Sequence, residues 1–343
     1  MVSTIDDTKR TAIGMKLADM KALQELLISN EQKFINECGD AEICDRIRDM
    51  LEDDRKNMGV LDTVIVQYGV KSEPKQTVTK MIQEARKMME GSELTLFEKV
   101  AQHELLKHKQ TMTGLLIHKC AQVVGADVEA AITPLNTVNF ENRAHQEQLK
   151  GILEILGTRE LTGKDPDQGI WARVQDAVAA FTGVAGSVVS RTKEDMNIQE
   201  IIRMDHTKVN TLFAQIQGTD DPQKIQEYFG QIYKDLSAHS EAEEEVVYPA
   251  VSSYYEKTED LYREQAEMKQ MLEQMKSMSA SSPNFKDQVK QLMDAVMHHV
   301  RQEENEMFPK INNNFSEQQQ EQMATDFKAA KSRVQDKMAA SMK

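Results

Sequence analysis

A short frame occurs twice in the second half of this 343-residue chain, with the same residue types at the same spacing. In each copy a histidine is followed four residues later by two adjacent glutamates, and an aromatic residue with a proline ends the frame. The matched residues are His239 with His299, Glu243 with Glu303, Glu244 with Glu304, Tyr248 with Phe308, and Pro249 with Pro309. Chance explains one copy easily, whereas two copies in register indicate a repeated structural unit.

The residues around this frame predict an all-α chain. Gly and Pro are scarce, at 15 and 7 copies, while helix-forming residues are abundant and apolar residues recur every three or four positions. Short connections between long helices imply antiparallel neighbours. The sequence therefore predicts two antiparallel four-helix bundles joined by a linker helix.

The first predicted domain spans residues 1–157 and contains four helical stretches. We expect these helices to end near Gly39, Gly69, Gly125 and Gly157, because glycine tolerates the left-handed dihedrals of a helix C-terminus. The second predicted domain spans residues 197–343 and contains four more helices. A final helix near its C-terminus is expected to lie across this second bundle.

Residues 158–196 are predicted to form a linker that includes an amphipathic helix around Trp171, the only tryptophan. This helix could contact a membrane or connect the domains by packing between them. No basic face accompanies its apolar one, so the connecting helix is the favoured interpretation.

Composition bounds the environment and the partners. The formal net charge of -14 argues against nucleic acid, whose phosphates would be repelled. Three cysteines without C-x-x-C spacing predict free thiols in a reducing compartment. Neither a signal pattern nor a run of about 18 apolar residues is present, so we expect a cytoplasmic protein without a membrane span.

The repeated frame has the geometry of a metal-binding face. Residues four apart lie one helical turn apart, so His239 with Glu243 and His299 with Glu303 can each bind one ion together. Imidazole and carboxylate suit iron, manganese or zinc, and two antiparallel helices would bring four such ligands to a bundle interior. The second glutamate of each pair points about 100 degrees away, towards solvent or the outer side of the site.

A related position on an earlier helix adds a further candidate ligand. His206 precedes His239 by 33 residues, and the equivalent place before the second copy is occupied by Glu267 and Met268. An isolated histidine is often an ordinary buried side chain. The place of His206 in the repeat, on an otherwise apolar helix face, makes it a predicted ligand.

Residues 198 to 315 resemble the hemerythrin-like family, the histidine-histidine-glutamate cation-binding domains. The resemblance implies a four-helix bundle that holds a non-haem diiron centre, with two iron ions bridged by carboxylates and an oxo or hydroxo group. It implies Glu243 and Glu303 as bridges and a full ligand set of His206, His239, Glu243, His299 and Glu303. Met268 stands where the family has a third motif histidine. Glu264, one turn earlier, is interpreted either as a replacement metal ligand or as a solvated surface acid.

The missing histidine bears on the function that the resemblance implies. Oxygen transport in the family depends on a histidine-rich pocket, whereas an added carboxylate favours iron oxidation or peroxide turnover. We therefore expect an oxidative-stress or iron-handling protein that binds dioxygen or hydrogen peroxide and decomposes peroxide, as a catalase-like or ferroxidase activity. The alternatives are a non-enzymatic iron or oxygen sensor or store, and a helical scaffold with a vestigial site.

Residues 10 to 157 resemble the helices of ferritin-like stress proteins more loosely. Glu104 and Glu141 occupy places where that family has metal carboxylates, and His145 follows Glu141 by four residues. In the Glu-x-x-His signature of that family the histidine follows the glutamate by three residues. The spacing from Glu141 to His145 is four, so the signature is absent. Two interpretations stay open, a second metal site or an inert bundle through which the chain forms a homo-oligomer.

Overall fold

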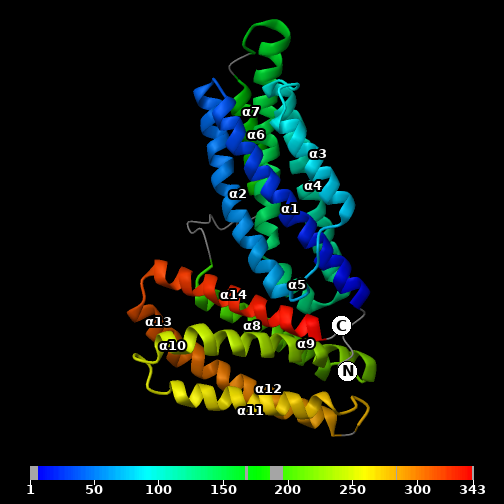
Figure 1. Ribbon diagram of the computed structural model, residues 1–343, viewed down its shortest axis with the longest axis vertical. Coiled ribbons are helices and arrows are strands. Elements are labelled where there is room, and N and C mark those ends of the chain that lie inside the picture. Colours follow the sequence, from blue (N-terminus) through cyan, green and yellow to red (C-terminus); the bar gives the residue numbers. More distant parts are fainter. Residues whose placement is uncertain (1–6, 167–168, 186–195, 283, 342–343) are drawn as a thin grey trace.

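The structure, a computed structural model, describes residues 7–166, 169–185, 196–282 and 284–341. Every regular element in these ranges is a helix, which confirms the prediction of an all-α chain. Figure 1 shows the helices of the first half running along the long axis of the molecule, while those of the second half lie across it. The predicted domain boundaries stay a prediction.

Four long helices build the first bundle around a buried apolar interior. They are α1 (Asp7–Glu37), α2 (Ala41–Tyr68), α4 (Leu96–Val124) and α6 (Leu135–Thr162). Leu17, Leu61, Ile117 and Val138 come from these four helices and meet in one apolar cluster. Burial of such side chains contributes about 1.5–3 kcal/mol each, so this cluster is a main source of the bundle's stability.

Two further helices of the first half differ from the four predicted stretches: α3 was not predicted, and α5 was expected to be the start of the fourth stretch. Helix α3 (Gln76–Glu90) packs against α1 through Val78, Ile82 and Ala85, which lie at helical spacing. The short helix α5 (Ala126–Ile132) connects α4 to α6 and lies against the second half.

The glycines expected to end helices behave in different ways. Gly69 has a φ of 75° and ends α2 as predicted. Gly157 lies inside α6, where a Cβ atom would come within 2.9 Å of the ring of Phe97. This glycine therefore permits close packing of α6 on α4, and α6 continues to Gly163, whose φ is 69°.

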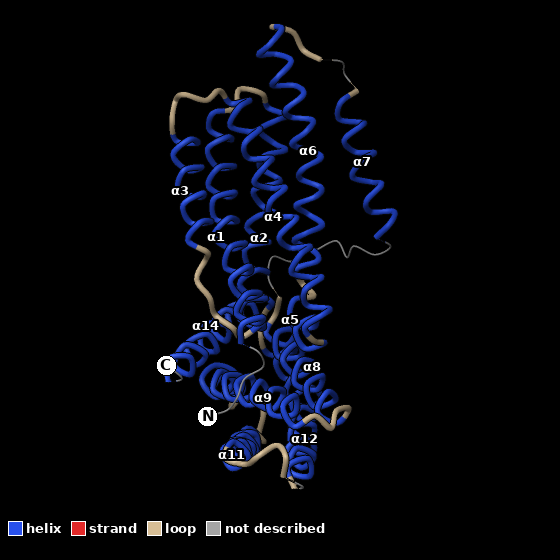
Figure 2. Tube along the Cα trace, turned by 90° about the vertical axis from the view of Figure 1, so that its right-hand side faces the viewer, coloured by secondary structure: helices blue, strands red, loops and turns tan. Residues whose placement is uncertain are grey.

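Helix α7 (Ile170–Ala185) carries Trp171 and packs along α6 of the first bundle. Figure 2 shows it beside α6, away from the second half, so the expectation of a helix packed between domains is wrong. Gly151 of α6 lies under Trp171 and Val174, where a Cβ atom would come within 2.8 Å of the Val174 side chain. The last residues of the predicted helix, 186–190, lie outside the described residues.

The second bundle consists of α8 (Ile198–Gln217), α9 (Pro222–Ala242), α11 (Thr258–Lys276) and α12 (Phe285–Gln302). Its apolar interior includes Phe213, Phe229 and Phe285. The expected final helix, α14 (Glu317–Ser341), packs against α9 and α8 on the side of the second bundle that faces the first half (Figure 1), and α8 also contacts α5 and α2 directly.

Both copies of the repeated frame contain a π-helical turn. These turns are η1 (Glu243–Val247) and η2 (Glu303–Met307), and the short helices α10 (Tyr248–Val251) and α13 (Phe308–Asn314) follow them. Pro249 and Pro309 each lie just after such a turn. A proline lacks the N–H for an α-helical hydrogen bond, and its ring clashes with the carbonyl four residues earlier. The wider π-helical turn before each proline relieves this clash.

One disulfide joins Cys38 and Cys44 across the turn between α1 and α2, with their Cα atoms 5.9 Å apart. The expectation that all three thiols are free is therefore wrong, and Cys120 is the free cysteine. The two cysteines face each other because the turn reverses the chain between them, which spacing alone did not reveal.

No helix within the described ranges is both long enough and apolar enough to cross a membrane.

Candidate metal centre

Four buried side chains converge inside the second bundle and form the candidate metal centre. They are His206 of α8, His239 of α9, Glu243 of η1 and Glu303 of η2, named here the quartet. One potential ligand atom of each lies within 4.8 Å of the others. Across the described part of the chain, this is the one group of three or more His, Cys, Asp or Glu residues with that geometry.

The helical spacing predicted from the sequence produces this convergence. His239 and Glu243 lie one turn apart, and their Nε2 and Oε2 atoms are 3.1 Å from each other. His206 faces them from α8, with its ring centroid 5.3 Å from that of His239. Glu303 enters from the second copy of the frame, with Oε2 at 3.2 Å from His206 Nε2.

The atoms that point into the quartet lack hydrogen-bond partners, as metal ligands would. They are Nε2 of His206, Oε1 of Glu243 and Oε2 of Glu303, all buried. The close pair between His206 and Glu303 does not have hydrogen-bond geometry. Orphaned buried polar atoms cost free energy unless something else satisfies them, so the quartet fits a cation.

The electrostatics of the quartet also favour bound positive charge. Burial opposes protonation of His239, but the charge of Glu243 and hydrogen bonding with Asp205 outweigh it and raise the pKa of His239 to about 10. Burial and the nearby charge of Glu303 raise the pKa of Glu243 above its usual value. Protons and a cation therefore compete for the same buried carboxylates and imidazoles.

His299, the other histidine of the frame, lies beside the quartet and not in it. Its Nε2 atom is 3.2 Å from Oε1 of Glu303 and 3.0 Å from the hydroxyl of Tyr248. Its Nδ1 atom is 2.8 Å from Oε2 of Glu264. Glu264 therefore contacts a histidine of the site from outside, and the structure does not bring it together with the quartet.

Gln265 of α11 is a functional candidate that the sequence did not reveal. Its amide donates to Oε2 of Glu243 at 2.8 Å and to the Tyr248 hydroxyl at 2.9 Å. Tyr248 in turn donates to Oε1 of Glu303 at 2.7 Å. Gln265 precedes Met268 by three residues, so both lie on the same face of α11. Met268 replaces the family's third motif histidine, and its position could have pointed to Gln265.

A second layer holds the imidazole of His239. Its Nδ1 atom lies 2.9 Å from Oδ2 of Asp205, the neighbour of His206 in sequence. Asp205 also accepts a hydrogen bond from Lys331 of α14. Burial opposes ionisation of Asp205, but the charge of Lys331 and the bond with His239 keep its pKa well below the usual value.

The quartet is enclosed, and its edge nearest to solvent is formed by Glu304 and Arg203. Glu304 lies 2.8 Å from Nδ1 of His206, and Oε2 of Glu304 is 3.8 Å from Arg203. The side chain of Arg203 is 49% exposed, against 6% for His206. The cavity beside the histidines has a volume of about 10 Å³, which fits about one water-sized sphere.

The charged interior of the first bundle is built differently. The ammonium of Lys107 lies 3.3 Å from Glu31, 3.0 Å from Nδ1 of His145, and in contact with Asp54. It supplies the positive charge that a metal ion would bring. Of the other candidates there, Glu104 accepts a hydrogen bond from Gln146, and Glu141 does not join a metal-binding group among the described residues.

Comparisons with known proteins agree with this site. The family model described as the hemerythrin HHE cation binding domain matches residues 197–311, which include the quartet. An uncharacterized hemerythrin-like protein of Schizosaccharomyces pombe is 30% identical over 139 residues, covering 39% of this chain and 68% of that protein. The match leaves out the first half, so its resemblance to ferritin-like proteins is not shown.

A second relative covers nearly the whole chain. It is a protein of Nostoc named DNA nickase, 66% identical over 342 residues, which are 98% of this chain and 97% of that protein. No solved structure matches significantly.

This relative overturns two predictions made from the sequence. The oxidative-stress role, whether as a diiron peroxide-decomposing protein or as an iron or oxygen sensor or store, is contradicted by a near full-length relative named DNA nickase. The exclusion of nucleic acid, with dioxygen or peroxide as the expected partner, is wrong for the same reason. Net charge sums over the entire surface, whereas contact with DNA depends on local groups.

Proposed function

The chain belongs to the hemerythrin-like family through its HHE cation-binding domain, and we propose that it nicks DNA with a cation held by the quartet. The observation that carries this proposal is the 66% identity, over 98% of the chain, to the Nostoc protein named DNA nickase. The two belong to one family along their whole length, so an activity of one is the first candidate for the other.

Nicking a strand hydrolyses one phosphodiester bond. The oxygen of water bonds to phosphorus while one P–O ester bond breaks, and a hydroxyl end and a phosphate end remain. A bound cation would supply Lewis-acid polarisation of the phosphoryl oxygen and a more acidic water. Two imidazoles and two carboxylates suit iron, manganese or zinc, and we propose iron, which the family resemblance implies.

The protein's own residues have three tasks in this proposal. His206, His239, Glu243 and Glu303 hold the cation, since one potential ligand atom of each lies within 4.8 Å of the others and all of them except His239 leave a buried polar atom without a partner. Tyr248 and Gln265 fix the two carboxylates through the hydrogen bonds described above. Arg203, half exposed at the edge of the site, holds a phosphate group of DNA in place of its present partner Glu304.

Supercoiled plasmid tests this proposal, because one nick converts it to open circles. The full chain is incubated under nitrogen with iron(II), manganese(II) or magnesium(II), and buffer with metal alone gives the background. We expect open circles before linear DNA, and loss of the activity with excess chelator.

Two histidine variants make the test specific to the quartet. His206→Ala removes a buried ligand, and we expect nicking to fall by about 100-fold or more, as when catalytic metal ligands are lost. His298→Ala, a substitution on the neighbouring helix at a side chain that is 63% exposed, should nick like the original protein. Equal activity of both variants would place the reaction elsewhere in the chain.

A further inference from the structure

The end of helix α2, in the first half of the chain, reaches into the second half close to the quartet. The carbonyl of Gln67 accepts a hydrogen bond from Lys208 of α8 at 2.6 Å, and Gln67 Nε2 donates to the carbonyl of Ile201 at 3.4 Å. Gln67 and Lys208 are each 2% exposed. The contact is therefore a buried polar junction, in which every broken bond is costly.

A continuous line of buried polar groups leads from this junction to a member of the quartet. Gln67 Oε1 accepts from the ammonium of Lys331 at 3.2 Å, and the same ammonium donates to Asp205. Asp205 lies 2.9 Å from Nδ1 of His239. The exposed fractions of Gln67, Lys331, Asp205 and His239 are 2%, 1%, 4% and 4%, so water does not screen the line.

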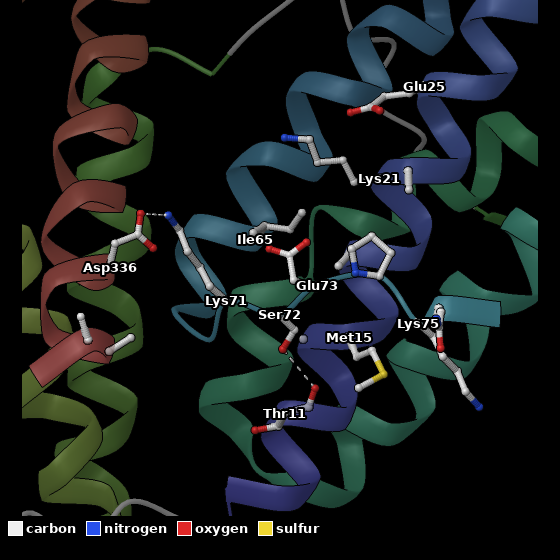
Figure 3. A pocket seen from close by; sticks show the side chains of 17 residues that line it. Thr11, Met15, Lys21, Glu25, Ile65, Lys71, Ser72, Glu73, Lys75 and Asp336 are labelled. Atoms are coloured by element: carbon white, nitrogen blue, oxygen red, sulfur yellow. Dashed lines mark hydrogen bonds and ion pairs between the residues drawn. The ribbon is translucent and has the colours of Figure 1, made fainter. Parts of the chain in front are cut away.

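The outer part of the same junction is open. A groove of about 1140 Å³ lies between α1, the loop after α2 and the end of α14, and it contains no member of the quartet. Figure 3 shows Lys71 reaching across it to Asp336, a pair whose side chains are 34% and 58% exposed. Exposed pairs of this kind contribute little, so the buried line carries the coupling between the halves.

We propose that the first half of the chain completes the cation site, with the line Gln67–Lys331–Asp205 holding the imidazole of His239 in place. Gln67 and Lys331 both lie outside residues 197–311, the segment that the family model covers. A carboxylate that orients a ligand histidine is itself ordered by its partners, and loss of such partners weakens metal binding. By linkage, cation binding and docking of α2 then stabilise each other. The inference rests on the cation site of the proposed function.

Cobalt(II) titration of the full chain, followed by absorption and calorimetry, tests this inference without using DNA. Gln67→Leu removes the acceptor of Lys331, and we expect cobalt affinity to fall by about three- to tenfold, less than the 10–100-fold typical of direct outer partners. The matched control is Gln335→Leu. Gln335 also joins α14 to α2, donating to the carbonyl of Val66 at 2.9 Å, but among the described residues its side chain makes no hydrogen bond to Asp205 or to the ammonium of Lys331.

The outcomes separate this inference from the proposed function. Weaker cobalt binding in Gln67→Leu, with Gln335→Leu within about twofold of the original protein, supports the coupling. Equal affinities in all three proteins, or an equal loss in both variants, would overturn it while leaving the cation site intact. If the original protein itself binds no cobalt, iron or manganese, the cation site of the proposed function fails first.

Discussion

At the scale of single residues, the chain uses two solutions to the same problem of buried charge. In the second half, two carboxylates face two imidazoles and leave ligand atoms unpartnered. In the first half, Lys107 fills the corresponding role, with its ammonium among Glu31, Asp54 and His145. The site in the second half is therefore suited to a cation from solution, whereas the cluster in the first half contains its own cation, the ammonium of Lys107.

Asp54 gives a testable dependence of stability on pH. Burial opposes its ionisation, but the charge of Lys107 and hydrogen bonding with His145 hold its pKa well below the usual value. A lowered folded-state pKa stabilises the fold fully at pH values above the unfolded pKa of about 3.9, and this stabilisation decreases progressively as the pH falls from there towards the folded pKa. Asp54→Asn should therefore cost about 3–5 kcal/mol at pH 7 and less below about pH 4.

Urea unfolding at several pH values checks this expectation. Asp53→Asn is the control, because Asp53 is the next residue and its side chain is 41% exposed, and its effect should stay below about 1 kcal/mol. A cost for Asp54→Asn that does not change between pH 7 and pH 3 would show that the charge of Asp54 does not stabilise the fold.

The sequence identified much of the site because helix geometry turns spacing into position. His206, His239, Glu243 and Glu303 were all predicted from the repeat and are brought together. The sequence did not reveal the residues that surround the quartet, which are Gln265, Asp205, Lys331 and Gln67. They lie on other helices or next to a ligand in sequence, and no repeated spacing marks them. Contacts between distant helices depend on packing, which periodicity does not specify.

At the scale of elements, long helices were predictable and their interruptions were not. Apolar spacing located α8, α9, α11, α12 and α14, but the π-helical turns η1 and η2 look like ordinary helix in the sequence. Gly157 looked like a helix end, yet it is a site of close approach to Phe97. A glycine can indicate either the end of a helix or a close contact between helices, and only the packing partner distinguishes the two.

Helix α7 offers an element-scale test through Trp171, the only tryptophan. The guanidinium of Arg46 lies 3.6 Å from the centre of its ring, and Gly151 leaves no room for a side chain beneath it. Gly151→Leu should therefore push α7 away from α6, shift the tryptophan emission to longer wavelength and increase quenching by acrylamide. Overpacking of this kind costs about 1–3 kcal/mol.

Gly39→Leu is the matched control, because a Cβ atom at Gly39 would meet nothing within 4 Å. Its emission spectrum should equal that of the original protein. An unshifted spectrum in Gly151→Leu would mean that α7 does not depend on this packing against α6.

At the scale of the whole molecule, the sequence predicted the fold and the cation-binding family but misjudged the function. The net charge of -14 suggested that DNA would be repelled, and the family resemblance suggested peroxide chemistry. A site that binds a cation can serve several reactions, so its ligands alone do not identify the substrate. The proposal that the substrate is DNA comes from the near full-length relative named DNA nickase.

The two halves of the chain depend on each other for the cation site. The end of α2 and helix α14 lie against the second bundle next to Asp205, which orients His239. The first half is then more than an attached domain, because its docking and the order of the cation site depend on each other.

The most direct test of the central claim is the rate of plasmid nicking, measured alongside bound metal, in Glu303→Gln and Glu306→Gln. Both substitutions fall in the same π-helical turn, but Glu303 is buried in the quartet while Glu306 is 41% exposed and pairs with Lys257. We expect Glu303→Gln to lose bound metal and to nick about 100-fold more slowly, whereas Glu306→Gln should keep both its metal and its activity. Nicking by Glu303→Gln at the original rate would contradict the central claim.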